Sequence, residues 1–433
     1  MEMKENKTLV MSPENPVWTD VFTGAHSLRY WLLLAPVFIV LLYQVGRGLG
    51  NTSYMLYWVT AVVLLVRTRS FAFPPAASVL YLALLAWGTL SAALSINPDG
   101  AYGKWAQYAL LGSSYFITWA LVRAIPEFSL ERAIRMIGVA GLIGFVYYAA
   151  RFLILSMSPD FHPELQVHGL VPAYLAPFAL YFICQTIKGK TGVALSLAYL
   201  ASLALLLVFS NSLTEVVTLA SALVVLVFFV VRSKRLLMFV IGVTVIAFIA
   251  LILAFDPAGH VLNQAEHTHE DWFTVLNQLS SFRTQLWYQA LTMPPPNQWL
   301  GVGPSNVGLY PPVVITGTYK VGHLHNLLLD CWYELGVVGL GLYLSFYAAQ
   351  IRSIKADAVR LFSLQYGVMY AAVSGIFVAT MLEQSYRSIH AALFVPFLFA
   401  LYGFEDSGKG TRQHAWNVVR GHDFRYSPLD RVK

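Results

Sequence analysis

The sequence predicts an all-α, polytopic integral membrane protein with about 12 membrane-spanning helices. Of its 433 residues, 57% are hydrophobic and only 12% are charged, and the mean hydropathy is +0.61. A soluble domain carries about 25% charged residues, whereas a membrane-spanning helix needs about 20 mostly apolar residues in a row. Twelve apolar segments approach that length, although the first two are short: 30–45, 52–66, 76–96, 101–121, 133–155, 170–187, 192–209, 213–231, 236–254, 326–349, 361–381 and 388–403.

The positive charges alternate from one loop to the next. If the N-terminus is cytoplasmic, 22 of the 28 lysines and arginines fall in cytoplasmic segments, and each of these segments is basic. Lys and Arg accumulate in the cytoplasmic loops of membrane proteins. We therefore expect an N-terminal tail at 1–29 and a basic tail at 404–433, both cytoplasmic, and an outward-facing segment at 255–325. The remaining six cations face outward: Arg47, Lys104, Arg151, Arg283, Lys320 and Arg387.

The tail at 1–29 is polar and lacks the apolar run and cleavage site of a secretory signal, so we expect none. In a soluble protein, the net charge of +6 would suggest a nucleic-acid partner. Here the cations lie between apolar spans, so the bilayer is the expected partner and nucleic acid is not. Cys184 and Cys331 fall in separate spans, where we expect packing rather than a disulfide or a metal site.

The segment 255–325 is the only long hydrophilic stretch between spans. Its middle predicts a short helix that carries Arg283, Leu286, Trp287 and Ala290 on about one face. A Met-Pro-Pro-Pro sequence ends this helix, because proline removes a backbone donor and clashes with the preceding turn. We expect the segment to lie amphipathically against the outer leaflet.

Two further patterns in this segment have more than one interpretation. His267 and His269 stand in a His-Thr-His-Glu-Asp run that looks like a metal cluster, but catalytic zinc needs ligands from spaced elements, and solvated surface is the alternative we favour. Gly301-Val-Gly303 lacks the Lys-Ser/Thr of a phosphate-binding loop. A turn with special backbone angles explains these glycines better.

Arg283 and His325 are the strongest candidates for chemistry. An arginine can hold phosphate oxygens by two parallel hydrogen bonds, and a neutral imidazole can accept a proton near pH 7. Both residues lie near the outer boundary of a chain with few charges. The alternatives are a snorkelling interfacial arginine and a helix-capping histidine, and the residues alone leave both pairs open.

Several motifs follow one another in a fixed order along residues 80–400. They are Ser95-Ile-Asn-Pro-Asp, Gly169-Leu-x-Pro-x-Tyr-Leu-Ala-Pro, Arg283-x-x-x-Trp287-x-x-Ala290-Leu291, Leu-Gly301-x-Gly303, His325-Asn326 and Glu334-Leu-Gly336-x-x-Gly339-Leu. In order and spacing they resemble the O-antigen ligase and O-antigen polymerase superfamily of bacterial envelope glycosyltransferases. The resemblance implies a GT-C-like membrane protein of the bacterial inner membrane, with 255–325 as a periplasmic loop between helices at 30–254 and 326–403.

The resemblance also implies the reaction. Family members move a glycan from undecaprenyl diphosphate to an acceptor sugar on the periplasmic face. By position, His325 and Arg283 correspond to the family's functional histidine and loop arginine. Attack opposite the diphosphate predicts inversion at the anomeric carbon. Because arginines can stabilise a departing diphosphate in place of a metal, we expect that the enzyme needs no metal and no other cofactor. Around the substrate we expect Arg387 or Arg151 as a second cation, together with Asn326, His323, Glu334 and Trp287.

The chain departs from the family pattern at one place. Members usually carry a Ser-Arg pair where this chain reads Ser210-Asn-Ser-Leu-Thr-Glu215, without an arginine. Either Arg151 or Arg387 replaces the missing charge, or the activity has changed. Glu215 and Glu383 are further candidates, since carboxylates at membrane depth are costly, although both residues could lie at the outer boundary.

Three functions remain open from the sequence. Ligation of a polysaccharide to the lipid A–core of lipopolysaccharide is favoured by the chain length and the single large outer loop. Polymerisation of repeat units uses the same motifs. A transporter of lipid-linked glycans is the third, but its expected marks, internal repeats and paired intramembrane charges, are not clear in the sequence.

Overall fold

The computed structural model describes residues 28–68, 73–125, 128–158, 169–209, 213–230, 283–310, 322–354, 363–382 and 385–403. Within these ranges all regular secondary structure is helical, which confirms the all-α class. The elements are α2 (Leu28–Val45), α3 (Arg47–Thr68), α4 (Pro75–Ala93), α5 (Pro98–Gly112), α6 (Ser114–Ala124), α7 (Leu130–Ser156), α9 (Leu170–Thr186), α10 (Gly189–Phe209), α11 (Leu213–Val230), α15 (Arg283–Thr292), the 3-10 turn η1 (Val307–Leu309), α16 (Leu327–Arg352), α18 (Leu364–Leu382), the π-helical turn η3 (His390–Phe394) and α19 (Val395–Gly403).

Many of these helices are built to cross a membrane. Seven described helices are long and apolar enough: α2, α3, α4, α7, α10, α16 and α18. Three shorter apolar helices, Leu170–Thr186, Thr214–Val230 and His390–Gly403, accompany them. Large apolar side chains such as Leu82 and Ile154 point outward, 64% and 69% exposed, as expected for a surface that faces lipid. The chain is a multi-pass membrane protein.

The expected spans agree with the described helices, with two differences in detail. Each expected range overlaps a described helix except 236–254, which lies outside the described residues, so the total number of spans stays a prediction. The range 101–121 is not one helix, because α5 ends and α6 begins at Ser113. The hydroxyl of Ser113 donates to the carbonyl of Leu110 and accepts from the indole of Trp58 at this break.

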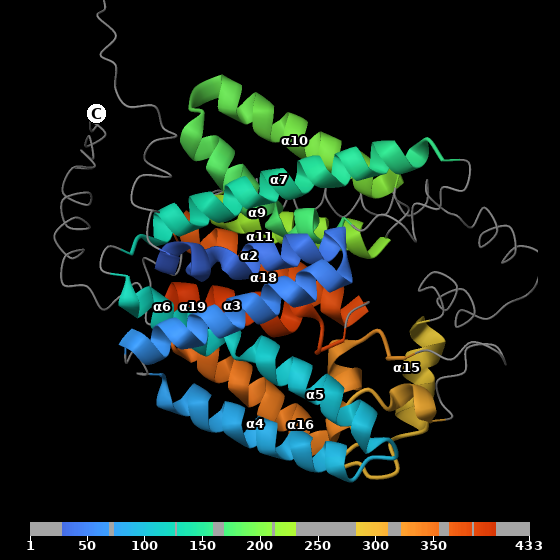
Figure 1. Cartoon of the computed structure of the whole chain (residues 1–433). Helices are drawn as coiled ribbons and strands as arrows, with labels where there is room; N and C mark the ends of the chain where they lie inside the picture. Colours follow the sequence, from blue (N-terminus) through green and yellow to red (C-terminus); the bar gives the residue numbers. More distant parts are fainter. Residues whose placement is uncertain are drawn as a thin grey trace, which may run out of the picture.

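The helices form a bundle in which α4 and α16 pack together along one edge (Figure 1). α7 packs on α9, and α11 packs on α18. The short helix α15 lies at one end of the bundle, beside the first turns of α16 (Figure 1). The side chain of Asn326 also contacts Met381 at the end of α18. The start of α16 and the end of α18 therefore lie together at this end of the bundle.

α16 is broken inside the membrane-spanning region. Gly336 has φ 70° and ψ −176°, so the helix axis is interrupted there, although the sequence predicts one continuous span at 326–349. A hydropathy pattern does not reveal such a break, because the residues on both sides are apolar. Within a bilayer a broken helix is tolerated only where protein or water satisfies its backbone.

The turn between α15 and η1 satisfies the broken backbone of α16. The amides of Val302 and Gly303 donate to the carbonyls of Tyr333 and Glu334, both at 2.9 Å. The indole of Trp87, from α4, donates to the carbonyl of Leu335 at 2.8 Å. In return, the Val337 amide donates to the carbonyl of Gln298 at 2.8 Å. The positive φ angles at Gly301 (77°) and Gly303 (91°) confirm that these glycines form a turn with special backbone angles.

Because of this break, Gly336→Ala is predicted to destabilise the protein. A Cβ at this position would lie 2.0 Å from the Trp299 carbonyl oxygen, and φ is in the left-handed region. The backbone alone should then cost about 1–3 kcal/mol, and the turn must also move. The thermal unfolding midpoint in detergent should fall clearly. Gly341→Ala is the matched control, because nothing lies within 4 Å of its added Cβ. A midpoint for Gly336→Ala equal to that of Gly341→Ala would contradict the described break.

Candidate active site

The helix α15 anchors the loop that carries the two histidines. Leu286 and Ala290, which were expected to share one face of this helix, are fully buried against Leu324 and Tyr333. The indole Nε1 of Trp287 donates to the carbonyl of Leu324 at 2.9 Å. Arg283 begins the same helix, so these contacts bring it to the end of the bundle where the histidines lie.

His323 and His325 lie against each other. Their ring centroids are 4.1 Å apart, and the backbone amide of His325 donates to Nδ1 of His323 at 3.2 Å. His325 has φ 51°, and Ser305 with φ 65° is the other non-glycine residue with positive φ among those described. A non-glycine residue held in this region costs about 1–3 kcal/mol, and such residues cluster at functional sites.

His323 is held in its neutral form. Burial, together with the charges of His325, Arg387 and Arg283, lowers the pKa of His323 to about 3. The hydrogen bond from the His325 amide is consistent with a neutral His323, because Nδ1 of His323 must carry a lone pair to accept this hydrogen bond. Since efficient proton transfer needs a pKa near the operating pH, His323 is a poor general base.

Asp330 connects the histidine loop to α16. Its side chain is fully buried; Oδ1 accepts from the amide of Leu324 at 2.6 Å, and Oδ2 lies 3.8 Å from Nδ1 of His323. The sequence analysis did not single out this residue. A signal was available, because Asn326, Asp330 and Glu334 are spaced by four residues and so share one face of a helix.

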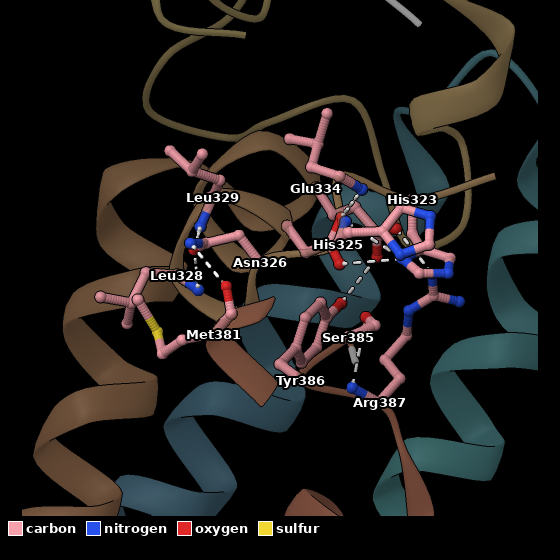
Figure 2. A network of polar contacts seen from close by, with 12 residues as sticks. His323, His325, Asn326, Leu328, Leu329, Glu334, Met381, Ser385, Tyr386 and Arg387 are labelled. Atoms are coloured by element: carbon pink, nitrogen blue, oxygen red, sulfur yellow. Dashed lines mark hydrogen bonds and ion pairs between the residues drawn. The ribbon is translucent and has the colours of Figure 1, made fainter. Parts of the chain in front are cut away.

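Glu334 and Arg387 form a buried ion pair. Nη2 of Arg387 donates to Oε1 of Glu334 at 2.7 Å, and the Tyr386 hydroxyl donates to Oε2 at 2.9 Å. The side chain of Glu334 is fully buried and that of Arg387 is 14% exposed. Figure 2 shows these three residues gathered with the two histidines. The Arg387 Nε is buried and has no hydrogen-bond partner among the described residues.

Tyr386 was also missed by the sequence analysis. It is fully buried between the rings of Tyr108 and Tyr343. Burial and the negative charge of Glu334 raise the pKa of Tyr386 well above its usual value, so its hydroxyl stays protonated and remains a donor. Nothing in the sequence around Tyr386 distinguishes it from the other tyrosines of the chain.

Asn326 is the N-cap of α16. Its Oδ1 accepts from the amides of Leu328 and Leu329, both at 3.1 Å, and its Nδ2 donates to the carbonyl of Met381 at 3.2 Å (Figure 2). An asparagine in this position satisfies amides that have no partner within the helix. The capping function that was considered for His325 therefore belongs to Asn326.

The structure separates the two candidates for the second cation. Arg387 belongs to the cluster described above. Arg151, in α7, donates instead from Nη1 to the carbonyl of Gln44 near the end of α2, at 2.6 Å. Glu215 also forms a hydrogen bond away from the cluster: its Oε1 accepts from the amide of Gly169, at the start of α9, at 2.6 Å. No described contact joins Arg151 or Glu215 to the histidine loop.

Several candidates from the sequence lie outside the described residues: His267, His269, Glu383 and the segment 210–212, where the family arginine is missing. Among the residues that the structure describes, no three His, Cys, Asp or Glu side chains gather as a metal site would require. His325, His323, Asp330, Glu334 and Arg387 form a polar cluster among the described residues, and the charge of Arg283 acts on it through His323.

Comparison with known proteins matches a part of the chain that includes most of this site. A family model described as O-antigen ligase matches residues 198–344, from α10 to the middle of α16. The matched range contains Arg283, the histidine loop, Asp330 and Glu334, whereas Arg387 follows it. None of the curated proteins matches the chain. The match at 198–344 supports the resemblance of the chain to the O-antigen ligase and O-antigen polymerase superfamily of membrane glycosyltransferases.

Proposed function

We propose that this chain moves a glycan from undecaprenyl diphosphate to an acceptor on the periplasmic face, and that the acceptor is the lipid A–core of lipopolysaccharide. One observation carries the proposal. At the end of a membrane bundle, the helix of Arg283, the paired histidines and the Glu334–Arg387 ion pair converge. Cations and a base at the membrane boundary suit a lipid-borne diphosphate and a hydroxyl acceptor.

Arg387 and Arg283 stabilise the leaving group. Departure of the lipid diphosphate develops negative charge, and fixed donors lower the barrier because they need no reorganisation. Glu334 holds Arg387 in place through Nη2, and the Tyr386 hydroxyl fixes Glu334. Arg387 also supplies the charge that family members take from the arginine missing near Ser212.

His325 accepts the proton of the acceptor hydroxyl. The hydroxyl oxygen attacks the anomeric carbon, the bond from that carbon to the diphosphate oxygen breaks, and the diphosphate leaves with the electron pair. Attack opposite the leaving group inverts the anomeric carbon. His323 stays neutral, with a pKa of about 3. Its ring packs against that of His325 and accepts a hydrogen bond from the backbone amide of His325, so the role of His323 is to position His325.

The orientation of the chain in the membrane can be tested directly. The cations Arg123, Lys188, Lys190 and Arg352 lie at the helix ends opposite the candidate site, which supports a cytoplasmic location for that end. In a Cys184→Ser background, Trp299→Cys should react with an impermeant maleimide in intact spheroplasts, because Trp299 is 69% exposed at the site end. Lys188→Cys should react only after lysis. The reverse pattern would overturn the orientation.

Transfer should need no divalent metal, because two arginines carry the charge compensation. Purified protein with undecaprenyl diphosphate-linked donor should retain its rate in excess EDTA. The same preparation, treated with EDTA and then given magnesium, serves as the control. A rate that disappears in EDTA and returns with magnesium or manganese would contradict the proposed arginine-based stabilisation.

The envelope polysaccharides of a deletion strain separate the candidate functions. Loss of a ligase leaves long chains on the undecaprenyl carrier and a bare core, which is the result we expect. Loss of a polymerase instead leaves cores with a single repeat unit. Loss of a transporter traps the units on the cytoplasmic face. Either of the last two patterns would overturn the proposed ligation.

A further inference from the structure

A pocket with two arginines in its lining lies at the end of the bundle opposite the candidate active site. It has a volume of about 800 Å³ and is formed by the start of α4 and the ends of α6, α16 and α19. α4 and α16 connect the two regions, because Ser91 and Glu334 lie at the site end and Pro75 and Arg352 at the pocket end. Figure 1 shows these two helices side by side along the edge of the bundle.

The polar wall of the pocket is positively charged. Arg123 ends α6 and Arg352 ends α16, and both line the pocket, whereas none of the described lining residues is acidic. The guanidinium of Arg123 lies over the ring of Trp119, 5.6 Å from its centroid, which holds the charge against the wall. The pocket is therefore complementary to an anion.

The other wall is apolar and formed mostly by alanine side chains. Ala76, Ala77 and Leu80 come from α4, and Ala348 and Ala349 come from α16. Such a wall accepts hydrocarbon without a cost in unpaired polar groups. A ligand that fits both walls has an anionic head and an apolar chain.

We propose that this pocket binds the headgroup of an acidic phospholipid, with an acyl chain along the alanine wall. The location decides for a lipid over a soluble phosphate, because Arg352 is the last residue of a 26-residue apolar helix and so lies at headgroup depth. Basic pockets between helices on the cytoplasmic side of a membrane bind such headgroups. The proposal does not depend on the glycosyltransferase activity.

The full-length protein in nanodiscs tests the proposal. Retained lipid is measured by native mass spectrometry after reconstitution with phosphatidylglycerol or with zwitterionic phosphatidylcholine. Wild type should retain phosphatidylglycerol selectively. An Arg123→Gln/Arg352→Gln double variant should bind it roughly 30-fold more weakly, because each basic side chain near an acidic membrane surface contributes about a factor of five.

The matched control is Lys188→Gln/Lys190→Gln, which removes two exposed cations at the same end of the bundle but outside the pocket. This variant should retain phosphatidylglycerol as wild type does. Unfolding midpoints in phosphatidylcholine, which should be equal for all three proteins, exclude a loss of folding. Equal loss in both double variants, equal retention of both lipids by wild type, or full displacement by inorganic phosphate would each overturn the proposal.

Discussion

His325→Ala is expected to slow glycan transfer by about 10²–10⁴, the usual contribution of a general base. The variant should insert into the membrane normally, because His325 lies in the loop before α16 and its neighbour Asn326 caps that helix. The measurement is transfer from purified undecaprenyl diphosphate-linked donor to acceptor, with protein quantified in the same membranes. His323→Ala should have the smaller effect, since that ring positions His325 without receiving the proton.

His325→Asn separates chemistry from backbone conformation. Asparagine tolerates the left-handed region better than most residues, so it suits φ 51° at this position, but it has no side chain that titrates near pH 7. Both variants at this position should therefore be inactive. If His325→Asn restored wild-type transfer, the role of His325 would be to shape the loop, and the proposed base would be wrong.

Arg387→Ala is expected to lose about 3–5 kcal/mol of stability, because it leaves the Glu334 carboxylate buried without its charged partner. Transfer should be lost with it. The double variant Arg387→Ala/Glu334→Gln should recover most of the stability, since a neutral amide needs no counter-charge, but it should not recover transfer. Thermal unfolding in detergent and the same transfer assay measure the two effects separately.

Arg151→Ala is the matched control for Arg387. It removes a guanidinium near the same end of the bundle, but one that donates to the Gln44 carbonyl away from the cluster. Its stability should fall only by about 1 kcal/mol, the worth of an ordinary hydrogen bond, and transfer should continue. Loss of transfer in Arg151→Ala and its retention in the Arg387→Ala/Glu334→Gln double variant would reverse the assignment of the second cation.

Sequence patterns predicted those features that depend on local composition. Apolar runs predicted the described spans, and the spacing of Leu286 and Ala290 predicted that they share one face of α15. The contacts of Glu334 could not be predicted in this way, because Tyr386 and Arg387 follow it by 52 and 53 residues. Only the packing of the end of α18 against the start of α16 brings them together.

The break at Gly336 escaped the sequence analysis for a different reason. Hydropathy measures how apolar a segment is and is insensitive to backbone angles, so two half-helices and one continuous helix have the same profile. The glycine itself was visible in the Glu334-Leu-Gly336 motif. Its meaning depends on the Trp299 carbonyl, which approaches the glycine from a turn that is distant along the chain.

The same break changes which parts of the protein control the position of the Glu334 carboxylate. A continuous helix transmits a shift along its axis, but at Gly336 the Val337 amide donates to Gln298 outside the helix, so the hydrogen bonds along α16 are interrupted between its two halves. The half of α16 before the break is held instead by α4, because Ser91 donates to the carbonyl of Glu334 and Trp87 donates to the carbonyl of Leu335. A substitution of Trp87 or Ser91 near the end of α4 should therefore displace Glu334 more than one placed equally far along α16 beyond the break. A change in α4 can then alter the Glu334–Arg387 ion pair while the residues that form the pair stay the same.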